Sequence, residues 1–215
     1  MPASAVAELG VVRRLRASPV SKIISELCNR GRVWLQRTSE VGRFGGIVLA
    51  DLRNSGSQTE HFRETILASL RLLQRTDPRR FARVQRHIVW ITNCTLSRGG
   101  AEYHHAVRSC FIDFQEPAPP FEPDYLIGWY ACTLVHEATH GVVRSRGILY
   151  TPEFRERIER LCVCEEQRFL RRLAAIEPEL AARIDLEFDA SDWNWYWGAT
   201  PFERFTTQMT RILTR

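Results

Sequence analysis

Hydrophobic spacing predicts alternating strands and helices in the first half of the chain. The apolar run at residues 47–52, bounded by glycines and by Asn54-Ser55-Gly56, is typical of a strand. Apolar residues then recur every three or four positions over residues 58–75, so we expect a helix that ends at Asp77-Pro78. The same criteria predict a short helix at residues 78–85, a strand at 87–92 and a strand at 103–115.

A long helix is expected at residues 125–146. It follows Glu122-Pro123-Asp124, which suits a helix start because proline fits the first turn and aspartate caps it. Arg144 and Arg146 fall in its last turn and Gly147 lies just beyond, which predicts the end of the helix. Apolar residues lie on nearly every side, so we expect this helix to be buried.

A second long helix should follow directly. Thr151-Pro152-Glu153 predicts its start, with threonine as the cap, proline at the first helical position and an acid in the first turn. The connection at residues 147–150 is short, so the two helices should pack antiparallel. The apolar positions at helical spacing in this second helix are Phe154, Ile158, Leu161, Cys162, Phe169 and Leu173.

We expect the 215 residues to form a single α+β domain with three parts. Residues 1–40 are a helical lead-in, followed by a glycine-rich turn at 42–46. Residues 41–175 form the core, in which a small mixed sheet packs on the long helix and on further helices. Residues 176–215 form an aromatic-rich C-terminal part that is mainly helical.

The C-terminal part holds an unusual group of aromatic residues. Trp193, Trp195, Tyr196 and Trp197 lie within five positions, between helices expected at residues 174–186 and 201–213. Such side chains bury much area, so they form either a wall of a substrate cleft, a partner-binding surface, or a cover over the core.

Composition and charge are ordinary for a globular protein. The chain is 44% hydrophobic and 26% charged, without the ~18–20 uninterrupted apolar residues of a membrane span. The N-terminal region has no basic-then-apolar signal pattern, so a cytoplasmic location is expected. The net charge is +5, but the arginines are spread along the chain between acids, so no nucleic-acid partner is expected.

The six cysteines include no C-x-x-C pair. Without a secretion signal, disulfides are not expected. Cys132 and Cys162 fall at apolar positions and are interpreted as small buried hydrophobic residues.

Candidate chemistry lies inside the helix expected at residues 125–146. The stretch from His136 to His140 has the form H-E-x-x-H. Residues four apart lie one turn apart on the same helix face, so the two imidazoles would be directed to one point. Glu137 would reach a water bound at that point. Two imidazoles with an adjacent carboxylate are what a zinc-activated hydrolase requires, whereas the alternative is a pair of hydrogen-bonded core histidines.

The motif helix and its flanks resemble the zincin metallopeptidases, and among them the gluzincins. The metzincin extension H-E-x-x-H-x-x-G-x-x-H is absent, because Val143 and Arg146 stand at its positions. The resemblance implies a Zn²⁺ ion held by His136, His140 and a glutamate of the next helix. It also implies that Glu137 is the catalytic base and that the substrate is a peptide or protein.

Three glutamates of the next helix are candidates for the third ligand. Glu159 is favoured, because the eighteen residues between it and the motif resemble the spacing in aminopeptidase-like and thermolysin-like gluzincins. Glu166, one heptad later on the same side, is the alternative, and Glu165 comes third. Cys162 and Val163 replace the small residue and aspartate that often follow the ligand glutamate in such families. Each glutamate has a plain alternative as a helix-edge carboxylate paired with arginine.

The order strand, helix, strand, strand and motif helix also resembles the minimal zincin domain. In that fold the strand nearest the metal is an exposed edge to which a peptide adds as a further strand. We therefore expect residues 110–114 to bind the substrate. The candidate donors to the developing oxyanion are Tyr150, Tyr196, His104 and His105.

The function expected from these residues is zinc-dependent hydrolysis of peptide bonds. One alternative is a zincin-like domain that binds metal for a structural or regulatory purpose; the intact Glu137 argues against it, because a structural site needs no base. Another is a DNA-associated regulator with a peptidase core, for which no helix-turn-helix pattern is visible.

Overall fold

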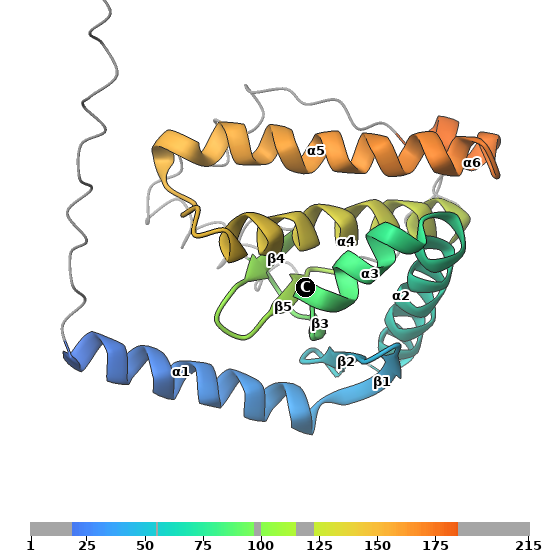
Figure 1. Cartoon of the computed structure of the whole chain (residues 1–215). Helices are drawn as coiled ribbons and strands as arrows, with labels where there is room; N and C mark the ends of the chain where they lie inside the picture. Colours follow the sequence, from blue (N-terminus) through green and yellow to red (C-terminus); the bar gives the residue numbers. More distant parts are fainter. Residues whose placement is uncertain (1–18, 55, 97–99, 115–122, 185–215) are drawn as a thin grey trace, which may run out of the picture.

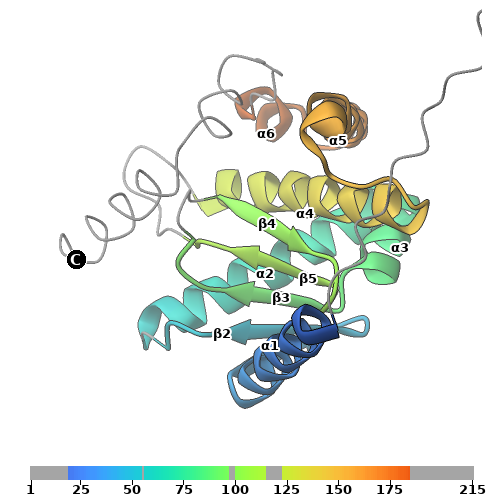
Figure 2. The same cartoon turned by 90° about the vertical axis from the view of Figure 1, so that its left-hand side faces the viewer.

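A computed structural model describes residues 19–54, 56–96, 100–114 and 123–184. This part of the chain belongs to the α+β class, as predicted, with a five-stranded mixed sheet and six helices (Figure 1). Helix α1 (Pro19–Thr38) lies on one face of the sheet and α2 (Ser57–Thr76) on the other (Figure 2). None of the described helices combines the length and the apolar character needed to cross a membrane.

The sheet has the strand order β1-β2-β3-β5-β4. Its three central strands, β2, β3 and β5, run parallel, and the two edge strands are antiparallel to their neighbours. All residues of β2 and β3 are buried, as expected for parallel strands covered on both faces. The strands are β1 (Glu40–Phe44), β2 (Ile47–Asp51), β3 (Trp90–Asn93), β4 (Ala101–His104) and β5 (Ser109–Ile112).

The prediction of a single strand at residues 103–115 is wrong, because the chain forms a hairpin of two strands, β4 and β5, in this region. The chain reverses at residues 105–108, where Arg108 adopts a φ of 50° that is uncommon for a residue with a side chain. The prediction of residues 110–114 as the substrate-binding edge is therefore also wrong. β5 lies between β3 and β4, and β4 is the edge strand at this end of the sheet.

Other predicted elements differ at their ends. Only Gly45 and Gly46, with φ of 54° and 86°, form the turn expected at 42–46, since the preceding residues are strand β1. The strand expected from residue 87 begins only at Trp90, because residue 87 is still part of helix α3 (Pro78–His87).

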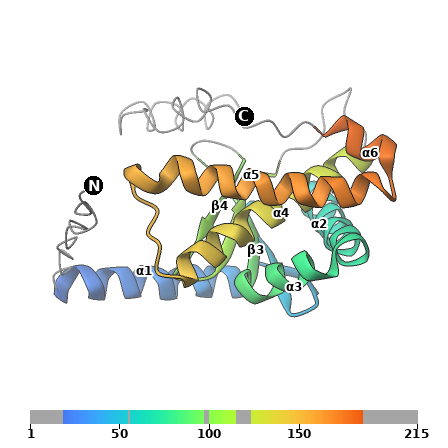
Figure 3. The same cartoon turned by 45° about the horizontal axis from the view of Figure 1, so that its top comes forward.

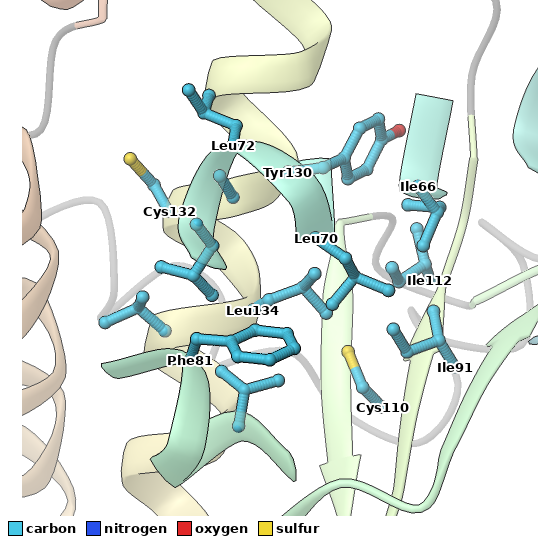
Figure 4. Close-up of a cluster of buried hydrophobic side chains, with 14 of the residues drawn as sticks. Ile66, Leu70, Leu72, Phe81, Ile91, Cys110, Ile112, Tyr130, Cys132 and Leu134 are labelled. Carbon is cyan, nitrogen blue, oxygen red and sulfur yellow. The ribbon is translucent and has the colours of Figure 1, made fainter. Parts of the chain in front are cut away.

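Helix α4 (Pro123–Ser145) carries the motif and is buried, as its apolar composition predicts. Figure 4 shows Leu134 of α4 among Leu70, Phe81 and Cys110, which come from α2, α3 and β5. The face of α4 that is turned toward the sheet thus packs against most of the core. This packing fixes the rotation of α4 about its axis and the direction of its histidines.

Helix α5 (Pro152–Ala174) runs antiparallel to α4 and lies against it in both views (Figures 1 and 3), as the short connection predicts. Gly147 lies in the turn that follows the end of α4 and has a φ of 79°, a conformation that suits glycine. Phe169 and Leu173 join the main core, whereas Cys162 belongs to a small cluster with Val143 and Ile158.

Gly141 allows α4 to approach the edge strand closely. A Cβ atom at this position would lie 2.7 Å from the Cβ of His87 and 3.1 Å from the hydroxyl of Tyr103 in β4. The Tyr103 hydroxyl also donates to the carbonyl of His87 at 3.0 Å. These contacts hold the part of α4 around His140 next to the exposed edge of the sheet.

The structure describes only some of the residues for which C-terminal elements were predicted. The helix expected at residues 174–186 is the shorter α6 (Pro178–Arg183), because Pro178 starts a new helix after α5 has ended. The aromatic group at residues 193–197, the helix expected at 201–213 and residues 1–18 of the lead-in lie outside the described residues.

Candidate metal centre

Three of the side chains predicted to hold a metal meet between α4 and α5. The rings of His136 and His140 lie one turn apart with their centroids 5.0 Å apart. Oε2 of Glu159 lies 3.0 Å from Nε2 of His136 and 3.6 Å from Nε2 of His140. One carboxylate oxygen thus faces the same nitrogen of both imidazoles.

Cys162 adds a fourth donor to these three. Donor atoms of His136, His140, Glu159 and Cys162 all lie within 4.8 Å of one another. Cys162 and Glu159 are buried, with 0% and 2% of their surface exposed, and His140 is partly exposed. The group is therefore compact and shielded enough to bind a metal ion.

Glu166 contacts the other nitrogen of His136. Its Oε2 lies 3.2 Å from Nδ1, so the imidazole is held between Glu159 on one side and Glu166 on the other. The two ring nitrogens point in different directions, so an ion bound to Nε2 cannot be bound by Glu166 in this arrangement. Glu166 instead fixes the orientation and the tautomer of the ring.

Glu165 is engaged elsewhere. Its carboxylate pairs with Arg80 at 3.0 Å, with Arg83 at 2.6 Å and with Arg168. These arginines lower its pKa against the opposing effect of burial. Glu165 thus has the role that the alternative interpretation gave to all three glutamates, a carboxylate paired with arginines.

The pKa values of the two histidines shift in opposite directions in the metal-free cluster. Burial disfavours a charge on His136, but the carboxylates of Glu166 and Glu159 outweigh it and raise its pKa well above the usual range. Burial and the positive charge of His136 together lower the pKa of His140 to about 4. His136 therefore carries the charge that balances the carboxylates, and a divalent ion bound at Nε2 would replace it.

Glu137 is a buried carboxylate with an unused oxygen. Only 5% of its surface is exposed, and its Oε2 has no hydrogen-bond partner among the described residues. Burial raises its pKa to about 7, opposed by His136 and reinforced by Glu159 and Glu166. A carboxyl group whose pKa lies near neutrality is suited to accept and return a proton.

Among the three oxyanion candidates that the structure describes, Tyr150 is the one that lies at the cluster. Its hydroxyl donates to Oε1 of Glu159, and its ring forms a T-shaped contact with the His140 ring at 5.5 Å between centroids. His104 instead contacts Arg32 of α1 through Nε2 at 2.7 Å. Tyr196 lies outside the described residues, and no described contact joins His105 to the cluster.

Cys162 is the member of the cluster whose apolar position in the sequence predicted only a core residue. Its sulfur is fully buried, and burial raises its pKa well above the usual range, reinforced first by Glu159 and Glu137. The sequence signal available for it is its position three residues after Glu159, on the same helix face.

Comparisons with models of known protein families, with curated protein sequences and with solved structures found no match. The geometry of the cluster is therefore the basis for assigning a function.

Proposed function

We propose that this protein is a zinc-dependent peptidase whose metal ion is held by His136, His140 and Glu159. The observation that carries the proposal is the presence beside these donors of Glu137, a buried carboxylate whose Oε2 has no hydrogen-bond partner within the described part of the chain and whose pKa is raised to about 7. A site that only binds metal has no need of such a group, since an unpaired buried carboxylate destabilises the fold.

The donor set supports zinc among the common metals. Two imidazoles, a carboxylate and a nearby sulfur are ligands that zinc accepts, whereas magnesium and calcium prefer oxygen ligands alone. When bound, zinc would supply a Lewis acid that lowers the pKa of a coordinated water toward ~7.

The surrounding residues have separate roles in the proposed reaction. Glu137 accepts the proton of the attacking water and later delivers it to the leaving amine. Tyr150 turns its hydroxyl from Glu159 to the developing oxyanion. Glu166 holds the ring of His136 so that Nε2 faces the ion.

The exposed edge strand β4 suits a peptide substrate. It is antiparallel to β5 and its outer side is unpaired among the described strands, so an extended peptide can add to it through backbone hydrogen bonds. Gly141 keeps the metal-binding part of α4 next to this edge. The resemblance to zincins, in which the edge strand nearest the metal binds the substrate, supports the same location.

A second candidate function is metal binding without hydrolysis. The observation that favours it is Cys162, because four protein donors are the number found in closed structural zinc sites.

Removal of zinc tests the proposed function. We expect the zinc-loaded protein to cleave members of a fluorogenic peptide library, to lose this activity after treatment with a chelator, and to regain it with one equivalent of zinc. Activity that persists in the metal-free protein would contradict the proposal. Zinc binding without cleavage of any peptide would favour the second candidate function.

Glu166→Gln should weaken zinc binding about 10–100-fold, the usual effect of removing a carboxylate that orients a metal-bound histidine. The amide keeps the size of the side chain but no longer holds the His136 ring as a charged acceptor. Competition with a chromophoric chelator measures the zinc dissociation constant. Glu165→Gln is the matched control, since this neighbouring carboxylate pairs with arginines and its loss should leave zinc affinity unchanged. Equal effects of the two variants would refute the orienting role.

A further inference from the structure

Cys162 is a fourth metal donor that the three-ligand mechanism does not use. Its sulfur lies within 4.8 Å of a donor atom from each of the other three residues, in a fully buried position. It packs beside Val143 and Ile158, which close this side of the cluster to solvent.

The two helices contribute donors in matching pairs. His136 and His140 are four residues apart on α4, and Glu159 and Cys162 are three residues apart on α5, so each pair lies on one helix face. Two antiparallel helices thus surround one point with four donors. A zinc ion bound to all four has a complete tetrahedral set and no position for water.

We propose that the Cys162 thiolate is a fourth zinc ligand that closes the metal centre in its resting state, so that water binds only after the sulfur has left the ion. This inference rests on the proposed function and names a regulatory state of the same site. The protein is then a latent peptidase, and removal of the sulfur activates it.

Cobalt substitution tests whether the sulfur binds the metal. A thiolate bound to Co²⁺ gives a near-ultraviolet charge-transfer band that imidazole and carboxylate ligands lack. We expect this band in the Co²⁺-loaded wild type and its loss in Cys162→Ala, which should still bind one Co²⁺ per chain. Cys110→Ala is the matched control, because Cys110 is equally buried but lies in β5 outside the donor group, and this variant should keep the band.

Peptide cleavage tests whether the sulfur closes the centre. Zinc-loaded Cys162→Ala should turn over peptides about tenfold faster than the wild type, the factor expected if the sulfur-bound form makes up about nine tenths of the resting population. Cys162→Ser, which is closer in size, serves the same purpose if the alanine variant folds poorly. The wild-type cobalt spectrum is informative without any variant.

The outcomes separate the two proposals. Co²⁺ bound by the wild type without the band overturns the inference and leaves the peptidase proposal intact. The same holds if the wild type cleaves peptides and both Cys162 variants cleave them at an unchanged or lower rate. A band that disappears in Cys162→Ala, with no cleavage by any of the proteins, supports the sulfur ligand and refutes the peptidase proposal. A wild type that binds no Co²⁺ refutes both.

Discussion

Glu137→Gln abolishes peptide cleavage and leaves the zinc ion in place. Glu137 is the only member of the site with a buried carboxylate oxygen that lacks a hydrogen-bond partner within the described residues, so it is the group placed to accept a proton. An amide of the same shape cannot do so, and loss of a general base typically costs about 10²–10⁴-fold in rate. Turnover and zinc content are measured on the same samples, in the wild type and in the Cys162→Ala background, where cleavage should be fastest.

The control for Glu137→Gln is Glu156→Gln, an exposed carboxylate on α5 that pairs with Arg160. This variant should match the wild type in both turnover and zinc content. If Glu137→Gln cleaves peptides at the wild-type rate with its zinc bound, Glu137 is not the base and the mechanism is wrong.

Glu159→Ala loses zinc. Structural zinc sites gain about 10–16 kcal/mol from roughly four ligands, so one ligand contributes about 2.5–4 kcal/mol, equivalent to a loss of about two to three orders of magnitude in affinity. Thermal unfolding should support this result, because zinc raises the melting temperature of the wild type but has little effect on the variant. Glu159→Gln, which keeps the side-chain volume between the two histidines, should show the same loss and excludes misfolding as the cause.

The same zinc titration compares the three glutamates of α5. Glu165→Ala should keep wild-type zinc affinity, because its carboxylate binds Arg80 and Arg83 instead of the cluster. The zinc affinity of Glu166→Ala should lie between those of Glu165→Ala and Glu159→Ala, since Glu166 reaches only Nδ1 of His136. A larger loss of zinc in Glu166→Ala than in Glu159→Ala would reverse the assignment of the third ligand.

The helices that carry the site follow from local sequence signals. Gly147 and Thr151-Pro152 mark the end of one helix and the start of the next, so the antiparallel pair of α4 and α5 is predictable from the chain alone. The helical spacing then brings His136 and His140 to one face and predicts that they converge.

The hairpin of β4 and β5 has no such local signal. Its turn contains neither glycine nor proline, the residues that usually indicate a turn in a sequence. Arg108 instead adopts the left-handed conformation that glycine usually adopts. The apolar pattern continues through the turn, so the segment resembles one strand. The identity of the exposed edge depends on how β5 pairs with β3, which is a tertiary property.

The separate roles of the α5 glutamates are also tertiary. Glu165 and Glu166 are adjacent in sequence, yet one faces arginines of α3 and the other faces His136 of α4. Only the packing of α5 against α4 distinguishes them. Cys162 was missed for a related reason, since an apolar position on a buried helix face is also a position that can face a metal.

Zinc content of the purified chain is the most direct test of the metal centre. After zinc loading and removal of free metal, elemental analysis should find one zinc per wild-type chain and none in the His136→Ala/His140→Ala protein. A wild-type chain without zinc, or a double variant that retains it, would contradict the metal centre between α4 and α5.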